Sequence, residues 1–155
     1  MSVSLHKIDH IKFVQKPWGY ERWLADEESG LPYILKEIRI YAPYRSSLQF
    51  HVCKKETAWI QEGSGFLHMS SIDIDVEKYK KGISCDQDFR DAVASVYSVP
   101  IRAGDVFHIP PGTIHRVDAV EDILLIEAST TEVDDVIRLE DDDNRPSGKI
   151  EDEHK

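Results

Sequence analysis

The sequence has 155 residues, 41% of them hydrophobic and 31% charged, and its formal net charge is −10. This length predicts one domain that can bury a core without disulfides, and no apolar run reaches the roughly 18 residues of a membrane helix. The negative charge argues against a nucleic-acid partner, because neutralising phosphates requires clustered Lys and Arg side chains. Two cysteines are too few for a disulfide scaffold and the N-terminus lacks a secretory signal pattern, so we expect no membrane partner and a cytoplasmic location.

In chain order, residues 1–15 are expected to form an N-terminal arm, in which 4–14 could be a short helix or an edge strand. Residues 16–140 are rich in short alternating or β-branched segments that are separated by turn signals. Strands are predicted at 33–41, 47–53, 56–61, 65–76, 94–101, 105–109, 114–120 and 123–130. Many short strands without a βαβ rhythm predict an all-β sandwich or barrel.

Helix and disorder are expected only in limited segments. Residues 86–94 could form a helical turn, with Phe89 and Val93 at i,i+4 spacing. Residues 141–155 are acidic and contain almost no apolar side chains. We predict a poorly ordered tail there, because such a segment cannot offset its ordering entropy by burial.

The stretch 47–53 carries an unusual polar face. In an extended strand, Gln49, His51 and Cys53 point to one side and the alternating apolar residues point to the other. This pattern predicts a polar pocket wall more readily than core packing. Glu56 follows after a two-residue turn, so it could return to the same pocket from the next strand.

A second stretch, residues 104–115, contains a Pro-Pro-Gly turn that is followed at once by His115. His51 and His115, together with the carboxylate of Glu56 and the amide of Gln49, form a plausible set of ligands for one divalent ion. Imidazole suits Zn, Fe, Ni and Co, and oxygen atoms can fill the remaining positions.

These two stretches resemble the two cupin motifs. In the first motif His51, Glu56 and the closing Gly63 match, while Gln49 stands where the leading histidine usually does. The second motif is matched at four fixed positions: Gly104, Pro110, Gly112 and His115. The resemblance implies a cupin jelly-roll barrel, a double-stranded β-helix, over residues 16–140.

Gln49 narrows the resemblance to one family of cupin-containing proteins. Ser47-Leu48-Gln49-Phe50-His51 is similar to the cupin domain of the mannose-1-phosphate guanylyltransferase/mannose-6-phosphate isomerase family. Further similar segments lie at 16–19, 45–51, 109–116, 125–128 and 135–141. Residues 70–97 exceed the corresponding family hairpin, so we expect an insertion there. Cys53 stands where the family usually has a third histidine.

The resemblance implies a metal-dependent sugar-phosphate isomerase that interconverts aldose and ketose phosphates through an enediol. The expected ligands are Gln49, His51, Glu56 and His115. They would hold one divalent ion, with zinc expected first and iron, nickel, cobalt or manganese left open. The expected partners are a sugar or sugar phosphate and a second copy of the chain, since cupins often pair through edge strands.

Five further residues are candidates for catalysis and substrate binding. Glu127 interrupts an apolar strand, so its carboxylate must be paired or have a raised pKa. It could act as a general base or be the partner of a buried arginine. His108 is a candidate proton shuttle, as is His68, although either could be a surface histidine. Arg116 and Arg45 are candidate phosphate binders, with a surface salt bridge as the alternative for Arg116.

Two other functions remain open from the sequence. A sugar-binding or regulatory cupin without turnover is compatible with the same motifs. Another metal-dependent cupin enzyme, such as a dioxygenase, is also compatible, although such enzymes more often keep the full histidine set that Gln49 breaks.

Overall fold

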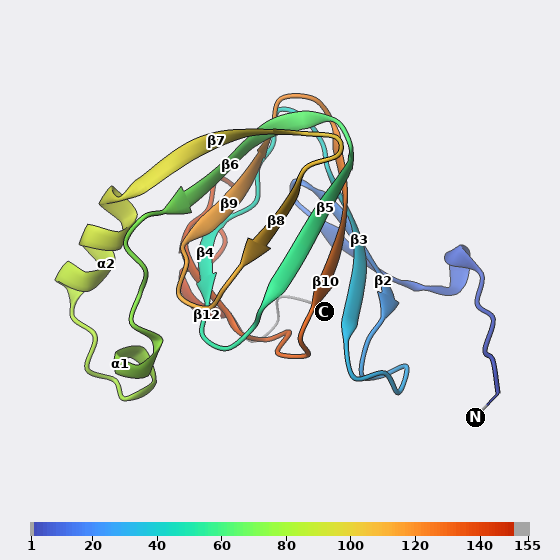
Figure 1. Cartoon of the computed structure of the whole chain (residues 1–155), viewed down its shortest axis with the longest axis horizontal. Coiled ribbons are helices and arrows are strands. Elements are labelled where there is room, and N and C mark those ends of the chain that lie inside the picture. The colour runs from blue at the N-terminus through green and yellow to red at the C-terminus, as the bar shows by residue number, and fades with distance from the viewer. Residues whose placement is uncertain (1, 151–155) are drawn as a thin grey trace.

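The computed structural model describes residues 2–150, which form two six-stranded sheets that roll into a barrel (Figure 1). Sheet A has the order β1-β2-β3-β10-β5-β8 and sheet B the order β12-β11-β4-β9-β6-β7. The strands of sheet A are β1 (Lys12–Lys16), β2 (Gly19–Ala25), β3 (Ile34–Ile40), β5 (Glu56–Glu62), β8 (Val106–Ile109) and β10 (Ile123–Ser129). Those of sheet B are β4 (Leu48–His51), β6 (Ser64–Ser70), β7 (Val96–Arg102), β9 (His115–Ala119), β11 (Val136–Glu140) and β12 (Gly148–Ile150). The predicted all-β jelly roll is confirmed.

The core lies between the two sheets and follows from the alternation of side chains along each strand. In β3 every second residue is buried, and β10 shows the same pattern opposite it. Ile40, Ile60 and Ile123 of sheet A are at most 2% exposed, and they share one cluster with Leu67 and Val117 of sheet B. Part of this apolar cluster, including Ile40 and Val117, also lines a cavity whose other walls are polar.

All eight predicted strands overlap observed ones, but the predicted 65–76 strand ends at Ser70. The chain bends after it, and Asp75 caps helix α1 (Val76–Lys80) by accepting bonds from the backbone N–H groups of Glu77 and Lys78. The sequence did not predict β2, β11 and β12. For residues 4–14 the sequence allowed either a helix or a strand, and β1 begins within that stretch. The exposed N-terminal arm is therefore shorter than the predicted 1–15.

The segment 70–97 folds as helices α1 and α2 (Asp86–Ala94), which lie to one side of the barrel (Figure 1). They pack on the outer side of sheet B, where the fully buried Phe50 meets the rings of Tyr79 and Phe89 at centroid distances of 5.5 and 6.3 Å. The helices therefore cover the apolar face that alternates with Gln49 and His51. Among residues 2–150, none of the helices has the length and apolar composition that crossing a membrane requires.

We expect Phe50→Ala to lower the free energy of unfolding by about 3–5 kcal/mol, because it empties the contact between sheet B and the two helices. Urea denaturation measures this loss. Ile72→Ala is the matched control, since Ile72 is 52% exposed beside the same helices, and it should change stability by about 0.5 kcal/mol or less. A cost for Phe50→Ala as small as that of the control would show that the helices are not docked on the sheet.

The C-terminal segment differs from its prediction over residues 141–150. β12 pairs with β11, and the Asp142 carboxylate accepts bonds of 2.6 and 3.0 Å from the guanidinium of Arg45. Asp141 likewise receives Nε and Nη2 of Arg145 at 3.0 Å each. Residues 141–150 bury few apolar side chains, so ion pairs and strand hydrogen bonds hold them in place instead. The amino-acid composition of the segment does not reveal such bonds. The predicted tail residues 151–155 lie outside the described residues.

Candidate metal centre and cavity

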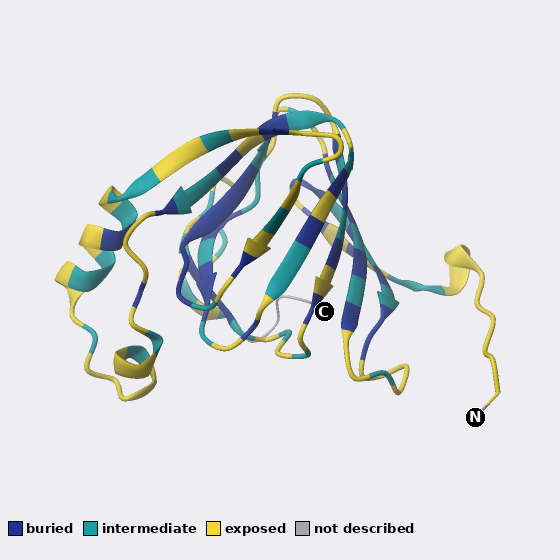
Figure 2. Cartoon of the chain, viewed as in Figure 1, coloured by how far each residue is buried: buried dark blue, intermediate teal, exposed yellow. Residues whose placement is uncertain are grey.

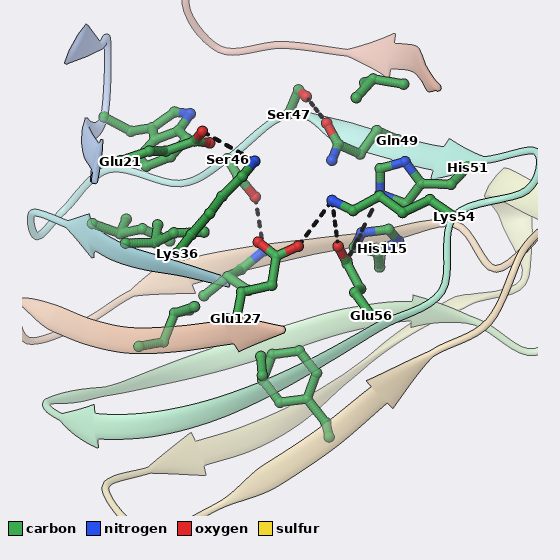
Figure 3. A pocket seen from close by; sticks show the side chains of 18 of the residues that line it. Glu21, Lys36, Ser46, Ser47, Gln49, His51, Lys54, Glu56, His115 and Glu127 are labelled. Atoms are coloured by element: carbon green, nitrogen blue, oxygen red, sulfur yellow. Dashed lines mark hydrogen bonds and ion pairs between the residues drawn. The ribbon is translucent and has the colours of Figure 1, made fainter. Parts of the chain in front are cut away.

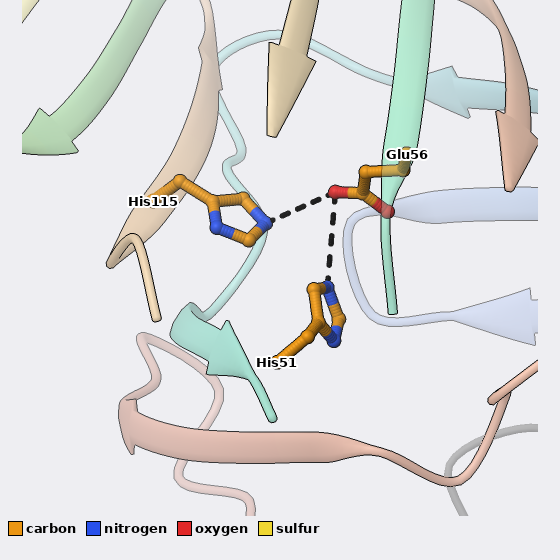
Figure 4. A group of neighbouring side chains, drawn as sticks. All are labelled: His51, Glu56 and His115. Atoms are coloured by element: carbon orange, nitrogen blue, oxygen red, sulfur yellow. Dashed lines mark ion pairs between the residues drawn. The ribbon is translucent and has the colours of Figure 1, made fainter. Parts of the chain in front are cut away.

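Three of the predicted ligands meet inside the barrel from three different strands (Figure 4). His51 ends β4, Glu56 begins β5 and His115 begins β9. Oε1 of Glu56 lies 3.2 Å from Nε2 of His115 and 3.7 Å from Nε2 of His51. The candidate ligand atoms of the three side chains all lie within 4.8 Å of one another. This spacing can accommodate one metal ion.

Both imidazoles are oriented from behind by backbone carbonyls. Nδ1 of His51 lies 3.3 Å from the carbonyl oxygen of Asp135, and Nδ1 of His115 lies 2.9 Å from that of Thr113. These contacts favour a proton on Nδ1 and direct each Nε2 lone pair toward Glu56, as in metal-binding histidines. Nε2 of His51 is buried and has no hydrogen-bond partner among residues 2–150. Burial lowers the pKa of His51, which favours the neutral form that a metal needs. The residues present therefore fit a divalent ion.

The Pro-Pro-Gly turn brings the two histidine strands into this arrangement. The N–H of Gly112 donates to the carbonyl of His51 at 2.8 Å, and the carbonyl of Gly112 accepts from the N–H of Ile74 at 2.9 Å. Gly112 has φ +84°, and a Cβ there would lie 2.4 Å from the carbonyl oxygen of Ile74. Only glycine combines this backbone conformation with so close an approach.

A buried lysine joins Glu56 to Glu127 (Figure 3). Nζ of Lys54 lies 2.8 Å from Oε2 of Glu56 and 2.9 Å from Oε1 of Glu127. Burial lowers the pKa of Lys54, but the two carboxylates outweigh burial and raise it. Burial raises the pKa of Glu127 to about 7, and the negative charge of Glu56 adds to this effect. Burial also tends to raise the pKa of Glu56, but the Lys54 ammonium and the two imidazoles hold that pKa well below its usual range.

A second buried ion pair lines the same cavity. Nζ of Lys36 lies 3.3 Å from Oε1 of Glu21 and 4.1 Å from the ring centroid of Trp23. Lys36 is paired in register with Glu127 across β3 and β10. The sequence alone did not point to Lys36, Glu21 or Lys54 as residues of the cavity. Lys36 had a visible signal, because it shares the buried face of its strand with three isoleucines.

We expect Lys54→Met to cost about 3–5 kcal/mol of stability, because it leaves buried carboxylates without their cation. Lys54→Met combined with Glu127→Gln should recover part of the loss, since one of the stranded charges is then removed. Lys55→Met is the control on an exposed neighbour. Denaturant titrations at constant pH measure all three variants, and equal stability of Lys54→Met and Lys55→Met would contradict a stabilising buried pair.

Gln49, which the sequence placed on a pocket wall, lines this cavity, and so does Glu127. Oε1 of Gln49 accepts a hydrogen bond from the Ser47 hydroxyl at 2.7 Å, and the side chain lies beside His51 (Figure 3). The partner of Glu127 is Lys54, whereas the sequence suggested a buried arginine as the possible partner. Arg145, from the C-terminal segment, also reaches the cavity lining.

Several predicted residues lie elsewhere. His108 points to the outer face of sheet A, where its Nδ1 lies 2.8 Å from the Thr57 hydroxyl, because the alternate residue Phe107 takes the inward position. His68 lies among residues of sheet B outside the cavity, with Ser98 and Asp118 at 2.6 and 3.2 Å. Neither imidazole lines the cavity, so the proton-shuttle assignment of His108 is corrected.

The two candidate phosphate-binding arginines also lie away from the cavity lining. Nε of Arg116 donates to the carbonyl of Ser46 at 2.8 Å, and its Nη2 lies 3.4 Å from Asp142. Arg45 is paired with the same carboxylate. Cys53 is exposed because β4 ends at His51 and the alternation stops there. The sequence missed the acid that engages both arginines.

No protein-family model matches the chain, and the comparison with curated proteins found no match. Solved structures do match. An oxalate decarboxylase from Lactobacillus farciminis, in a formate complex, has a TM-score of 0.61 at 15% identity over 84% of this chain and 34% of its own. Ectoine synthase from P. lautus has a TM-score of 0.59 at 14% identity, over 83% of this chain and 78% of its own. The polyketide cyclase RemF from Streptomyces resistomycificus has a TM-score of 0.59 at 18% identity, over 90% of this chain and 86% of its own. The chain thus spans about a third of the decarboxylase's length. These likenesses establish the cupin fold.

Proposed function

We propose that this cupin-fold chain is a metal-dependent isomerase of sugar phosphates, of the mannose-6-phosphate isomerase type. One observation carries the proposal. Two oriented imidazoles and Glu56 converge on a point in the cavity, and a further buried carboxylate, Glu127, is linked to that point through Lys54. A metal site and a proton acceptor thus share one enclosed space, as carbonyl enolisation requires.

His51, Glu56 and His115 would hold the ion, with Gln49 as a fourth ligand and zinc as the expected metal. When bound, a divalent ion supplies Lewis-acid polarisation of a substrate carbonyl. Glu127 takes the proton from the hydroxyl-bearing carbon beside that carbonyl and returns it to the former carbonyl carbon, while the hydroxyl proton passes to the former carbonyl oxygen. Lys54 holds the Glu127 carboxylate in place throughout, which limits the reorientation that proton transfer needs.

Arg145, rather than Arg116 or Arg45, takes the predicted role of binding an anion. Arg145 is among the residues that line the cavity, and its guanidinium is fixed by two bonds to the Asp141 carboxylate. A guanidinium held in this way can orient a phosphate at the cavity wall, away from the reacting carbons. Asp142 pairs with the other two arginines, neither of which lines the cavity.

A coupled assay with purified protein, reloaded in turn with zinc, cobalt, iron, nickel or manganese, tests the proposal on a panel of sugar phosphates. Interconversion of mannose 6-phosphate and fructose 6-phosphate is the expected result. Metal binding without turnover of any sugar phosphate on the panel would contradict the isomerase. Sugar binding in the same samples would then favour a binding protein without turnover.

An oxygenase is the second candidate, because two histidines and one carboxylate with open positions form the ligand set of non-haem iron(II) oxygenases. Oxygen uptake by the iron-loaded protein distinguishes the two functions. The ion pair between Lys54 and Glu56 favours the isomerase, since it couples the ligand set to a proton acceptor, and proton transfer is what isomerisation needs.

A further inference from the structure

Lys36 is a buried cation to which the proposed reaction gives no role. Its side chain is 1% exposed and lines the cavity (Figure 3). Residues of β2 and β3 alternate between buried and partly exposed positions (Figure 2), and this alternation turns Lys36 inward, between Trp23 and Glu127 in register. An ammonium in such a place loses its hydration, so the groups around it indicate what it can bind.

The ammonium of Lys36 has more donors than the side chains of residues 2–150 accept. It carries three N–H groups. Within the described chain its only hydrogen-bond acceptor is Oε1 of Glu21 at 3.3 Å, and the ring centroid of Trp23 lies 4.1 Å from Nζ in a second direction. Nε1 of Trp23 also donates to Oε1 of Glu21, at 3.1 Å, so the three side chains hold one another in place. One N–H is therefore fixed in position and available to a ligand in the cavity.

The charges around Lys36 favour a neutral oxygen over an anion. Glu21 is bonded to the ammonium, and Glu127 lies opposite Lys36 on the next strand. Apart from the histidines, the charged side chains of the cavity lining balance one another: Lys36, Lys54, Arg145, Glu21, Glu56 and Glu127. A phosphate at Lys36 would meet two nearby carboxylates, whereas a hydroxyl oxygen accepts the hydrogen bond without adding charge. The expected ligand group is therefore a hydroxyl.

The order of the groups in the cavity assigns this hydroxyl a place on the substrate. Figure 3 shows Lys36 on one side of Glu127, and Glu56 with the two histidines on the other. If the carbonyl lies at the metal site and Glu127 acts on the two reacting carbons, the next carbon of the sugar chain lies toward Lys36.

We infer, on the basis of the proposed function, that Lys36 is a substrate-binding residue that reads the hydroxyl of the third carbon. Its ammonium donates a hydrogen bond to that oxygen, while Glu21 and Trp23 fix the ammonium in place. A deoxy sugar leaves this buried donor unpaired, so the site selects sugar phosphates that carry a hydroxyl beside the two reacting carbons.

Calorimetric titration with a ligand that cannot isomerise tests this inference. The probe is mannitol 6-phosphate, numbered as mannose 6-phosphate, and its 3-deoxy analogue lacks only the hydroxyl in question. Lys36→Met should weaken binding of the parent ligand, in the presence of zinc, roughly 10–100-fold, the effect of losing a hydrogen bond to a charged group. The same variant should bind the 3-deoxy analogue about as well as the wild type does, because the bond is then already absent.

Lys12→Met is the matched control. Nζ of Lys12 lies 4.3 Å from the ring centroid of the same Trp23, but it pairs with Trp23 from β1 and does not line the cavity. This variant should bind both ligands as the wild type does. Because Lys36→Met leaves Glu21 without its cation, Lys36→Met combined with Glu21→Gln is measured as well, and it should show the same selective loss. Circular dichroism shows that each variant is folded.

Equal binding of the parent ligand by Lys36→Met and the wild type would overturn the inference, and so would an equal loss for both ligands. Absence of binding to the wild type would overturn it together with the proposed substrate class. Hydroxyl-selective binding without turnover of any sugar phosphate would uphold the role of Lys36 and contradict the isomerase. Turnover with an unchanged kcat/KM in Lys36→Met would uphold the isomerase and overturn the role of Lys36.

Discussion

Replacement of His115 by alanine is expected to remove most of the bound divalent ion, and His51→Ala should do the same. Each change deletes one of the two imidazoles whose Nε2 atoms face Glu56. Removing a residue that only hydrogen-bonds to a metal ligand typically lowers metal affinity about 10–100-fold. Removing a ligand itself should lower the metal affinity further. Elemental analysis after dialysis against dilute metal gives the stoichiometry, and titration with cobalt gives the affinity.

His68→Ala and His108→Ala serve as matched controls, since each removes an imidazole that the structure places outside the cavity. Both variants should keep the wild-type stoichiometry. If His51→Ala and His115→Ala also kept it, the ion would have to bind elsewhere in the protein. Thermal unfolding of the metal-free proteins separates a loss of ligand from a loss of fold.

The sequence predicted the parts of this site that lie within short motifs. His51 and Glu56 are five residues apart on consecutive strands, and the Pro-Pro-Gly turn fixes where His115 emerges. Local alternation also predicted the inward side of Gln49. The need of the Glu127 carboxylate for a partner or a raised pKa followed in the same way, because the strand around it is regular and apolar.

The rest depends on contacts between distant segments, which a local pattern does not contain. Lys54 and Glu127 are separated by 73 positions, and Arg45 and Asp142 by 97. The first contact holds a lysine in the cavity, and the second pairs an arginine that does not line it. The acidic composition of residues 141–155 suggested disorder, yet β11 provides a strand edge on which β12 pairs. In each case a partner far along the chain decides the outcome.

Glu127→Gln is expected to lower turnover about 10²–10⁴-fold, the usual contribution of a general base, while leaving the metal content nearly unchanged. The pKa of Glu127 is raised to about 7 by burial and by the charge of Glu56, so both protonation states are accessible near neutral pH. Glutamine keeps the shape and can still accept a bond from Lys54, but it cannot take up a proton. The acidic limb of the rate–pH profile should therefore disappear together with most of the activity.

The control for this change is Glu37→Gln, which neutralises a carboxylate on the outer face of sheet A, paired with Arg22, and should leave turnover unchanged. Steady-state rates with metal-saturated protein measure both variants. If Glu127→Gln retained full turnover, another group would have to carry the proton, and Lys36 would be the next candidate because it lies opposite Glu127 in register. If the variant instead lost its metal, Glu127 would support the ligand set through Lys54 and Glu56 rather than act on the substrate. A selective loss of turnover with the metal retained is the result that only the proton-transfer role explains.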